Sequence, residues 1–380
     1  MPFVARFVAR VPFHVRYTLL ALASTRIALA LIGVGSRMLL MPLVGQEYVW
    51  KYSESPWLDI WGVFDSGWYL SIAVHGYRAD LSSAAATLGQ ANYGFFPLYP
   101  MLIRGLALLV RDPYLAGIAL SNICLFLACI SLYKLARLDS DQDTAVASIR
   151  YLLVFPVSFI LSGVFTESLF LLLAIMCFYY GKRRRWLLVG IIGFLLALTK
   201  SVGTLVFLPM LYEYAREKDF KLRGVRPDIL CLLLIPLGLL VFAGHNYFLT
   251  GDCLAFVHVQ ETGWGHRLTN PLLFLINNLR GNNVLLRFEA CFTIALLVLL
   301  NTFYRRIGFS YWLLAMCAIF LPLATTTISM PRYSLVVFPI YILLAKLARK
   351  SWIDQIMTAL LCLLQGCLMV FWSNGFALVI

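Results

Sequence analysis

Charged residues are scarce in this chain. They make up 13% of its 380 residues, while hydrophobic residues make up 61%, and a soluble globular domain usually carries about 25% charged residues. This composition excludes an ordinary soluble domain and indicates a membrane protein. Because about 20 apolar residues form one helical span, the apolar content suffices for about ten or eleven spans. Little sequence is left for a separate soluble domain.

The sequence also lacks the common signatures of soluble enzymes. It contains no G-x-x-x-x-G-K-[ST], G-x-S-x-G or H-E-x-x-H motif, which excludes the standard P-loop, nucleophile-elbow and zinc-protease sites. Alternating ten-residue segments are absent as well, which argues against an outer-membrane barrel. The expected fold class is therefore an all-α polytopic membrane protein with about eleven transmembrane helices.

The nine cysteines give no sign of a disulfide framework or a zinc site. No C-x-x-C pair occurs, and only Cys253 falls in an expected external loop, whereas the other eight lie in apolar runs. Paired spacings would be needed for either kind of cross-link. We expect the cysteines to be unpaired.

Positive charge exceeds negative charge, with 31 Lys and Arg against 18 Asp and Glu and a net charge of +13. The basic residues are clustered between apolar runs, as in cytoplasmic loops of membrane proteins. Topology therefore explains the excess, no nucleic-acid partner is expected, and the N-terminus is predicted to be cytoplasmic. The clusters are Arg6, Arg10 and Arg16; Lys134 and Arg137; Lys182 to Arg185; Arg216 to Arg226; Arg305 and Arg306; and Lys346 to Lys350.

Assigning spans by apolar runs gives a single domain over residues 1–380. Residues 45–93 form a large external loop with short interfacial helices, and residues 94–111, interrupted by Pro97 and Pro100, form a re-entrant or interfacial helix. Four short central spans are predicted as V-shaped hairpins. The predicted spans are 18–42, 114–136, 148–163, 166–181, 186–199, 202–215, 228–249, 284–304, 309–328, 332–348 and 353–374.

The first external loop holds the densest group of polar and aromatic residues. Asp65 lies between Phe64 and a Ser-Gly turn, and Trp68 and Tyr69 follow at once. Partial desolvation beside aromatic rings suits a general base, and ring faces commonly support a sugar. The alternative is that Asp65 only caps the following helix, with Trp68 and Tyr69 as interfacial anchors.

Further polar residues interrupt apolar stretches at the same external level. Lys200 and Arg332 are cations on a side that otherwise has few, so each requires an anionic partner: Glu167, a lipid headgroup or a bound phosphate. A structural ion pair is an equally good interpretation of either cation alone. The other candidates are His75, Glu167, His258, Gln260 and Tyr333.

The acidic run Asp139, Asp141 and Asp143 is not a calcium site. An EF-hand loop starting there requires glycine at its sixth position and glutamate at its twelfth, but Thr144 and Arg150 occupy them. We interpret this run as a solvated cytoplasmic loop with helix-capping acids. No divalent metal and no other cofactor are predicted.

Several of these segments occur in the order found in one known family. The segment from Phe64 to Tyr77 reads F-D-S-G-W-Y-L-S-I-A-V-H-G-Y, and the segment 95–100 reads F-F-P-L-Y-P. Together with T-E-S-L-F at 166–170, L-T-K-S at 198–201, T-G-D-C-L-A-F at 250–256 and R-Y at 332–333, they make the chain resemble the PIG-V-like mannosyltransferases, which are related to the GPI mannosyltransferase that adds the second mannose. These are GT-C glycosyltransferases. Phe64 replaces a frequent tryptophan, and Lys200 replaces a frequent arginine and so loses the bidentate fork.

The resemblance implies transfer of mannose from a polyprenyl-phosphate carrier to an acceptor hydroxyl at the extracytoplasmic face, with inversion. It implies that Asp65 is the catalytic base. It also implies that Arg332, Lys200 and His258 bind the donor phosphate. Sugar or acceptor contacts are expected from Trp68, Tyr69, His75, Glu167, Gln260 and Tyr333.

The resemblance leaves the acceptor open: a glycolipid, a glycan or a protein. A prokaryotic member would lie in the inner membrane with its site facing the periplasm or exterior, which the compact length favours, and a eukaryotic member would lie in the endoplasmic reticulum. We expect a monomer surrounded by membrane lipids. The rival interpretations are a polytopic transporter or lipid-linked-sugar flippase, which would need a pathway open to both sides, and a GT-C enzyme that uses another lipid-linked sugar.

Overall fold

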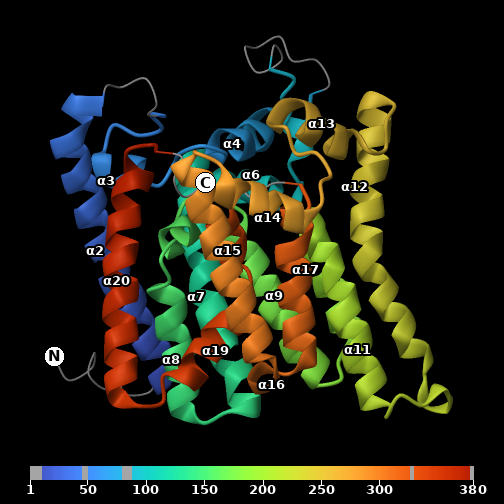
Figure 1. Cartoon of the computed structure of the whole chain (residues 1–380). Helices are drawn as coiled ribbons and strands as arrows, with labels where there is room; N and C mark the ends of the chain where they lie inside the picture. The colour runs from blue at the N-terminus through green and yellow to red at the C-terminus, as the bar shows by residue number, and fades with distance from the viewer. Residues whose placement is uncertain (1–10, 45–49, 79–87, 326–328, 377–380) are drawn as a thin grey trace.

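The computed structural model describes residues 11–44, 50–78, 88–325 and 329–376, and these residues form helices, turns and loops without strands. The longer helices stand roughly side by side, and α4 and α13 lie across one end of the bundle (Figure 1). The elements are α2 (Phe13–Val44), α3 (Pro56–Asp59), α4 (Ser66–His75), η1 (Asn92–Gly94), α6 (Leu98–Val110), α7 (Pro113–Asp139), α8 (Gln142–Leu153), η2 (Ser158–Ser162), α9 (Glu167–Lys182), α10 (Trp186–Ala197), η3 (Ser201–Val206), α11 (Phe207–Glu217), η4 (Leu222–Gly224), η5 (Pro227–Leu233), α12 (Leu234–Thr250), α13 (Ala255–Trp264), α14 (Pro271–Arg280), α15 (Val284–Thr302), α16 (Tyr304–Ile307), α17 (Phe309–Leu323), α18 (Met330–Ser334), α19 (Pro339–Leu347) and α20 (Ser351–Ser373).

Five of the described helical segments are long and apolar enough to cross a membrane alone. They have 19 to 28 residues and match five of the predicted spans, since about 20 residues cover the hydrocarbon core. The prediction of an all-α integral membrane protein is confirmed. The five segments are Phe13–Leu40, Pro113–Asp139, Pro227–Thr250, Val284–Thr302 and Ser351–Ser373.

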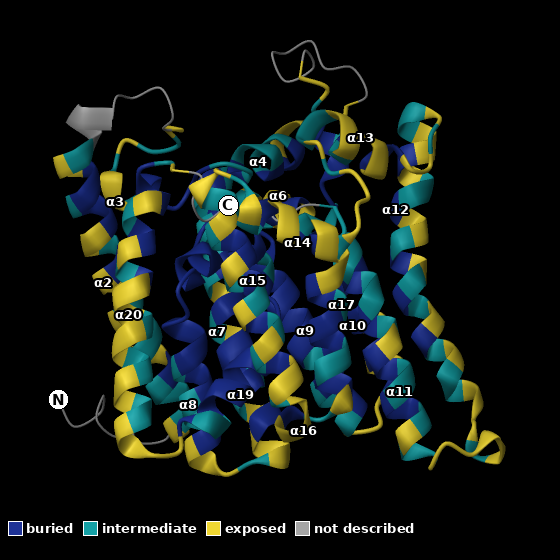
Figure 2. Cartoon of the chain, in the orientation of Figure 1, coloured by how far each residue is buried: buried dark blue, intermediate teal, exposed yellow. Residues whose placement is uncertain are grey.

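The predicted short central spans correspond to shorter helices in the middle of the molecule. Helix α9 has 16 residues, α10 has 12 and α11 has 11. Most residues of α9 are buried and none is exposed, and the same holds for α19, which lies in the predicted span 332–348. Helix α9 packs against α7 and α10, and these elements form much of the dark blue interior in Figure 2. Helices surrounded by other helices are apolar on all sides, which is why these segments read like membrane spans.

The predicted span 148–163 is broken in the structure. Helix α8 ends at Leu153 and η2 starts at Ser158, because Pro156 lacks an amide hydrogen and disfavours helix before it. Two side chains from other helices bind the carbonyl groups that the break frees. Arg26 on α2 donates to the oxygen of Ser158 at 2.9 Å, and the Gln365 amide on α20 donates to that of Leu153, also at 2.9 Å. Both carbonyl groups thereby keep a hydrogen-bond donor within the bundle.

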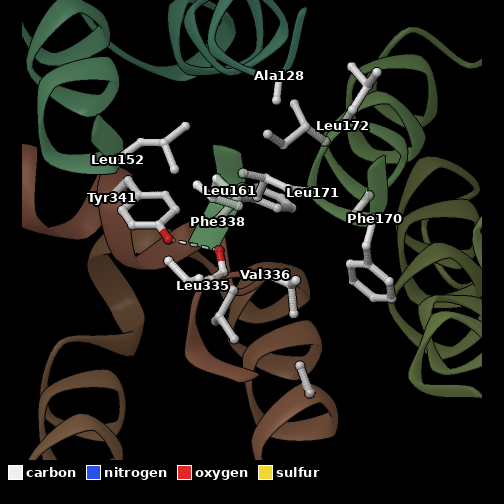
Figure 3. Packing of buried hydrophobic residues seen from close by; sticks show 14 of the residues in the cluster. Ala128, Leu152, Leu161, Phe170, Leu171, Leu172, Leu335, Val336, Phe338 and Tyr341 are labelled. Atoms are coloured by element: carbon white, nitrogen blue, oxygen red, sulfur yellow. Dashed lines mark hydrogen bonds between the residues drawn. The ribbon is translucent and has the colours of Figure 1, made fainter. Parts of the chain in front are cut away.

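The interior of the bundle is densely packed. Side chains from α8, α9 and the segment joining α18 to α19 interdigitate in Figure 3, among them Leu152, Leu171 and Phe338. The Tyr341 hydroxyl donates to the Leu335 oxygen at 2.7 Å and so satisfies both polar groups within the core. This packing joins α8 and α9 to the segment between α18 and α19.

The basic clusters of the described residues lie at helix ends on the side of the bundle opposite α4 and α13, where α16 lies (Figure 1). Arg6 and Arg10 lie outside the described residues. Ion pairs join the helix ends there: Arg349 contacts Asp141 at 2.6 Å, and Lys182 pairs with Asp139. Asp141 also accepts from the Thr144 amide at 2.8 Å and caps α8, as predicted for this acidic run. All nine cysteines are unpaired, which was also predicted.

The described part of the first loop is fixed to the bundle by a buried ion pair. Arg37 on α2 contacts Asp59 at 2.6 Å, and both side chains are buried. Asp59 also accepts from the amides of Tyr52 at 2.6 Å and Ser53 at 3.0 Å, while the Trp372 indole on α20 donates to the Ile60 oxygen at 2.9 Å. These bonds fix the chain five residues before Asp65.

Candidate functional site

Asp65 is directed away from the helix that it precedes. It occupies the N-cap position of α4, yet its side chain makes no capping hydrogen bond. Its carboxylate instead accepts from Arg332 Nη1 at 2.7 Å, across 267 positions of sequence. The preceding residue, Phe64, has a φ of 50°, a conformation that is costly for a bulky residue and that clusters at functional sites. The structure therefore shows an ion pair with Arg332 where the capping alternative requires a hydrogen bond to α4, and the catalytic role of Asp65 stays a prediction.

Arg332 connects Asp65 to a second ion pair. It belongs to the short helix α18, and its Nε lies 3.5 Å from Glu167 Oε1. The same oxygen accepts from Lys200 Nζ at 2.6 Å. Glu167 is thus the anionic partner of Lys200, one of the three partners that the sequence left open. We call Asp65, Glu167, Lys200 and Arg332 the ionic cluster.

The members of the ionic cluster differ in their access to solvent. The Glu167 side chain is 1% exposed and that of Arg332 10%, whereas Lys200 and Asp65 are 17% and 21% exposed. Two cations and two carboxylates balance in charge, which such a buried group requires. Asp65 and Lys200 are the members that a ligand would reach first.

Aromatic rings surround the cations. The Arg332 guanidinium lies 5.6 Å from the ring centroids of both Phe165 and Tyr333, and Lys200 Nζ lies 5.6 Å from Tyr333. Cations are attracted to ring faces at such distances. Tyr69 is buried next to the cluster and packs edge-on against Tyr99 at 5.4 Å. The site thus combines charge with a largely aromatic wall.

Trp68 belongs to a second group of rings on the same side. Its ring stacks on Phe95 at 5.5 Å and meets Trp264 edge-on at 5.6 Å. Gly94 allows α13 to approach this segment closely, since a Cβ there would lie 2.8 Å from Val259 and 3.2 Å from the Gln260 amide. Gln260 therefore lies beside this aromatic group, as does the start of α6 that the F-F-P-L-Y-P segment forms.

Two of the predicted residues lie apart from the ionic cluster. His258 contacts Asp252 at 2.6 Å, and its side chain is 58% exposed. His75 is the exposed last residue of α4. Among the described residues, the structure records no bond from either histidine to the cluster. Their binding roles stay predictions.

Two residues near the site were not singled out in the sequence. His266, in the loop after α13, is near enough to Arg332 and Asp65 to feel their charges; burial, and then the Arg332 charge, lower its pKa from the usual value. Glu289 is buried on α15 and accepts backbone bonds from Ser329 and Met330. A signal for Glu289 was available, because it is an acid within a predicted span.

Within the described ranges, no group of three or more His, Cys, Asp or Glu residues is arranged to hold a metal ion. The two carboxylates of the cluster are each occupied by a cationic side chain. Lys200 and Arg332 are hydrogen-bond donors without acceptor capacity, so a ligand that binds through them must offer acceptor atoms.

Comparisons with known proteins give only distant matches. No protein-family model matches the sequence, and no curated protein matches it. Among solved structures, the chain is similar to the oligosaccharyltransferase of Archaeoglobus fulgidus tethered to an acceptor peptide, with 14% identity and a TM-score of 0.44 over 94% of this chain and 55% of that one. It is likewise similar to the archaeal oligosaccharyltransferase AglB in complex with an inhibitory peptide and a dolichol-phosphate, with 14% identity and a TM-score of 0.45 over 93% of this chain and 56% of that one. The chain thus spans little more than half the length of these proteins.

Proposed function

We propose that this protein is a membrane glycosyltransferase that transfers a sugar from a polyprenyl-phosphate carrier to an acceptor hydroxyl. The observation that carries the proposal is the ion pair between Asp65 and Arg332, 2.7 Å apart at one end of the bundle. A carboxylate suited to accept a proton thus lies directly beside a cation suited to hold a phosphate. Transfer from a phosphate ester requires both groups within one small site.

The donor phosphate would compete with Asp65 for Arg332. A guanidinium binds phosphate through two parallel hydrogen bonds, which a single contact to Asp65 does not provide. When Arg332 turns to the phosphate, the Asp65 carboxylate loses its cation and becomes free to accept a proton. Binding of the donor would therefore activate the base, and the donor would bind before the acceptor reacts.

In the proposed reaction, Asp65 takes the proton of the acceptor hydroxyl. The acceptor oxygen forms a bond to C1 of the sugar as the bond from C1 to the phosphate oxygen breaks. The leaving polyprenyl phosphate gains negative charge, which Arg332 and Lys200 stabilise. Glu167 fixes both cations, since its carboxylate lies 2.6 Å from Lys200 and 3.5 Å from Arg332.

A lipid-linked donor also suits the position of the site. The ionic cluster belongs to the end of the bundle where α4 crosses (Figure 1), and helices with many exposed apolar side chains extend away from that end. A polyprenyl phosphate matches this arrangement, because its phosphate headgroup is charged and its isoprenoid tail is apolar. A donor of this kind brings its own leaving group and needs no nucleotide-binding domain.

The finer assignment rests on the resemblance of the quoted segments to PIG-V-like mannosyltransferases of the GT-C class. It makes mannose the sugar, inversion the stereochemical course and the extracytoplasmic side the location of the site. Trp68, Tyr69 and Tyr333 would then contact sugar or acceptor. Glucose- and arabinose-linked polyprenyl phosphates are the competing donors, to be assayed in parallel.

The decisive experiment compares the wild type with Asp65→Asn in detergent, using labelled polyprenyl-phosphate-mannose. Because the acceptor is unknown, both transfer and donor hydrolysis are recorded. We expect Asp65→Asn to fold and bind the donor but to lose about a hundredfold or more of its activity, as for loss of a general base. Glu54→Gln in the same loop, whose side chain is 91% exposed, is the matched control and should remain active.

Two results would overturn the proposal. One is an Asp65→Asn variant as active as the wild type. The other is a folded wild type that neither binds nor consumes any of the lipid-linked sugars, which would move the transporter interpretation forward. Transport of a lipid-linked sugar in proteoliposomes, without its consumption, would establish that alternative.

A further inference from the structure

Glu289 is a buried acid that the proposed reaction does not use. It lies on α15 and is 0% exposed. One of its carboxylate oxygens accepts from the Ser329 amide at 3.0 Å, and the other accepts from the Met330 amide at 2.8 Å. Burying a carboxyl group is costly unless it is hydrogen-bonded, and both oxygens of Glu289 accept a backbone hydrogen bond.

The two amides mark the start of α18. Ser329 has a φ of 71° and Met330 begins the helix. A left-handed serine costs free energy, and surrounding contacts must hold it. A helix of five residues is also too short to be stable by itself. Glu289 contributes to both, because it binds the amides of the two successive residues, Ser329 and Met330, at which α18 begins.

Helix α18 carries the central cation of the site. Arg332 is two residues beyond Met330, and its guanidinium reaches Asp65 at 2.7 Å while packing against the rings of Phe165 and Tyr333. Helix α18 has only five residues, so its start and Arg332 lie within a little more than one helical turn of each other. A displacement of the start of α18 therefore displaces the guanidinium.

We infer that Glu289 is a positioning residue, which holds α18 so that Arg332 can bind the donor phosphate. The inference rests on the proposed function for the identity of that ligand. Glu289 does not touch the ionic cluster through a hydrogen bond of its own; it acts through the backbone that carries Arg332.

The first test is kinetic and uses Glu289→Gln. The amide keeps the shape, but its NH2 group cannot accept, so one of the two backbone bonds is lost and the charge disappears. We expect the KM for polyprenyl-phosphate-mannose to rise about ten- to hundredfold, as for a misplaced catalytic group, with a smaller change in kcat. The matched control is Glu213→Gln, since Glu213 is also buried and accepts from Arg216 at 2.6 Å on α11. Its donor KM should stay at the wild-type value.

The second test does not depend on catalysis. The thermal stabilities of Asp65→Asn, Arg332→Gln and the double variant give the coupling between Asp65 and Arg332. We expect a clear coupling in the Tm values of the wild-type background and its loss when Glu289→Gln is present. If the wild type consumes no donor but the coupling is lost in this way, the proposed function fails and the positioning role stands.

The inference is overturned if Glu289→Gln leaves the coupling intact and the donor KM unchanged. It is also overturned if Glu213→Gln raises the donor KM as much, because the effect would then belong to any buried carboxylate. Should Glu289→Gln not fold, Glu289→Asp is measured in its place. Its carboxylate is retained but is one methylene shorter, so we expect an intermediate rise in donor KM, and an unchanged value would refute the role.

Discussion

Replacement of Lys200 by methionine tests whether the ionic cluster is a balanced buried group. Lys200 Nζ is 2.6 Å from Glu167 Oε1, and Arg332 Nε is 3.5 Å from the same atom. At an effective dielectric constant of about 20, the gross attractions at these distances are about 6 and about 5 kcal/mol. Lys200→Met removes the larger attraction and leaves the smaller one.

The net cost should be smaller than these gross values. Removing one partner of a buried ion pair usually costs about 3–5 kcal/mol, and the attraction that Arg332 retains should offset somewhat less than half of it. We therefore expect Lys200→Met to lower the free energy of unfolding by about 2 kcal/mol, which corresponds to a fall in Tm of roughly 2–3 °C for a chain of 380 residues. The Glu167 side chain is 1% exposed, so water does not replace the lost cation.

The measurement is thermal unfolding in detergent, with Lys200→Met compared with Lys200→Met/Glu167→Gln. The double variant removes the uncompensated charge and leaves Arg332 paired with Asp65, so its Tm should return most of the way to that of the wild type. Lys200→Arg, which keeps the cation, should also remain stable. A double variant as unstable as Lys200→Met alone would refute the electrostatic explanation and leave lost packing as the cause.

Two further predictions concern the surroundings of the site. Arg37→Met leaves Asp59 buried without its cation, so thermal unfolding in detergent should show that the free energy of unfolding falls by about 3 kcal/mol. Donor turnover should fall as well, because Asp59 fixes the first loop, which carries Asp65. Lys51→Met is the control: it breaks the exposed pair of Lys51 with Glu54 and should change neither the stability nor the turnover. Burial, and then the Arg332 charge, lower the pKa of His266 in the folded protein, so the unfolded chain binds the proton more readily. The free energy of unfolding is therefore highest above the usual histidine pKa and should fall as the pH drops below it. His266→Gln should flatten the Tm profile between about pH 7 and 5, and an unchanged acid slope would contradict this assignment.

The two cations of the ionic cluster could be predicted from the sequence. Lys200 and Arg332 are identifiable because each places a charge beside apolar runs on the predicted external side, where few cations are expected. The same reasoning applied to Glu289 would have identified it, since it is an acid within the predicted span 284–304. The sequence left three partners open for Lys200, and only the spatial arrangement selects Glu167, 33 residues away.

Composition and the spacing of apolar runs were sufficient to determine an all-α membrane protein, the five long spans and the gathering of the basic clusters at one end of the bundle. Those features depend on hydrophobic burial and charge, which each segment carries in its own residues. Tertiary structure alone decided that α9 and α19 are enclosed by protein, that Asp65 pairs with Arg332 instead of capping α4, and that Trp264 completes the rings around Trp68. The physical reason is that a helix surrounded by other helices is as apolar as one in lipid, and a carboxylate in water has no preference among cations until folding excludes the water and brings one of them within hydrogen-bond distance.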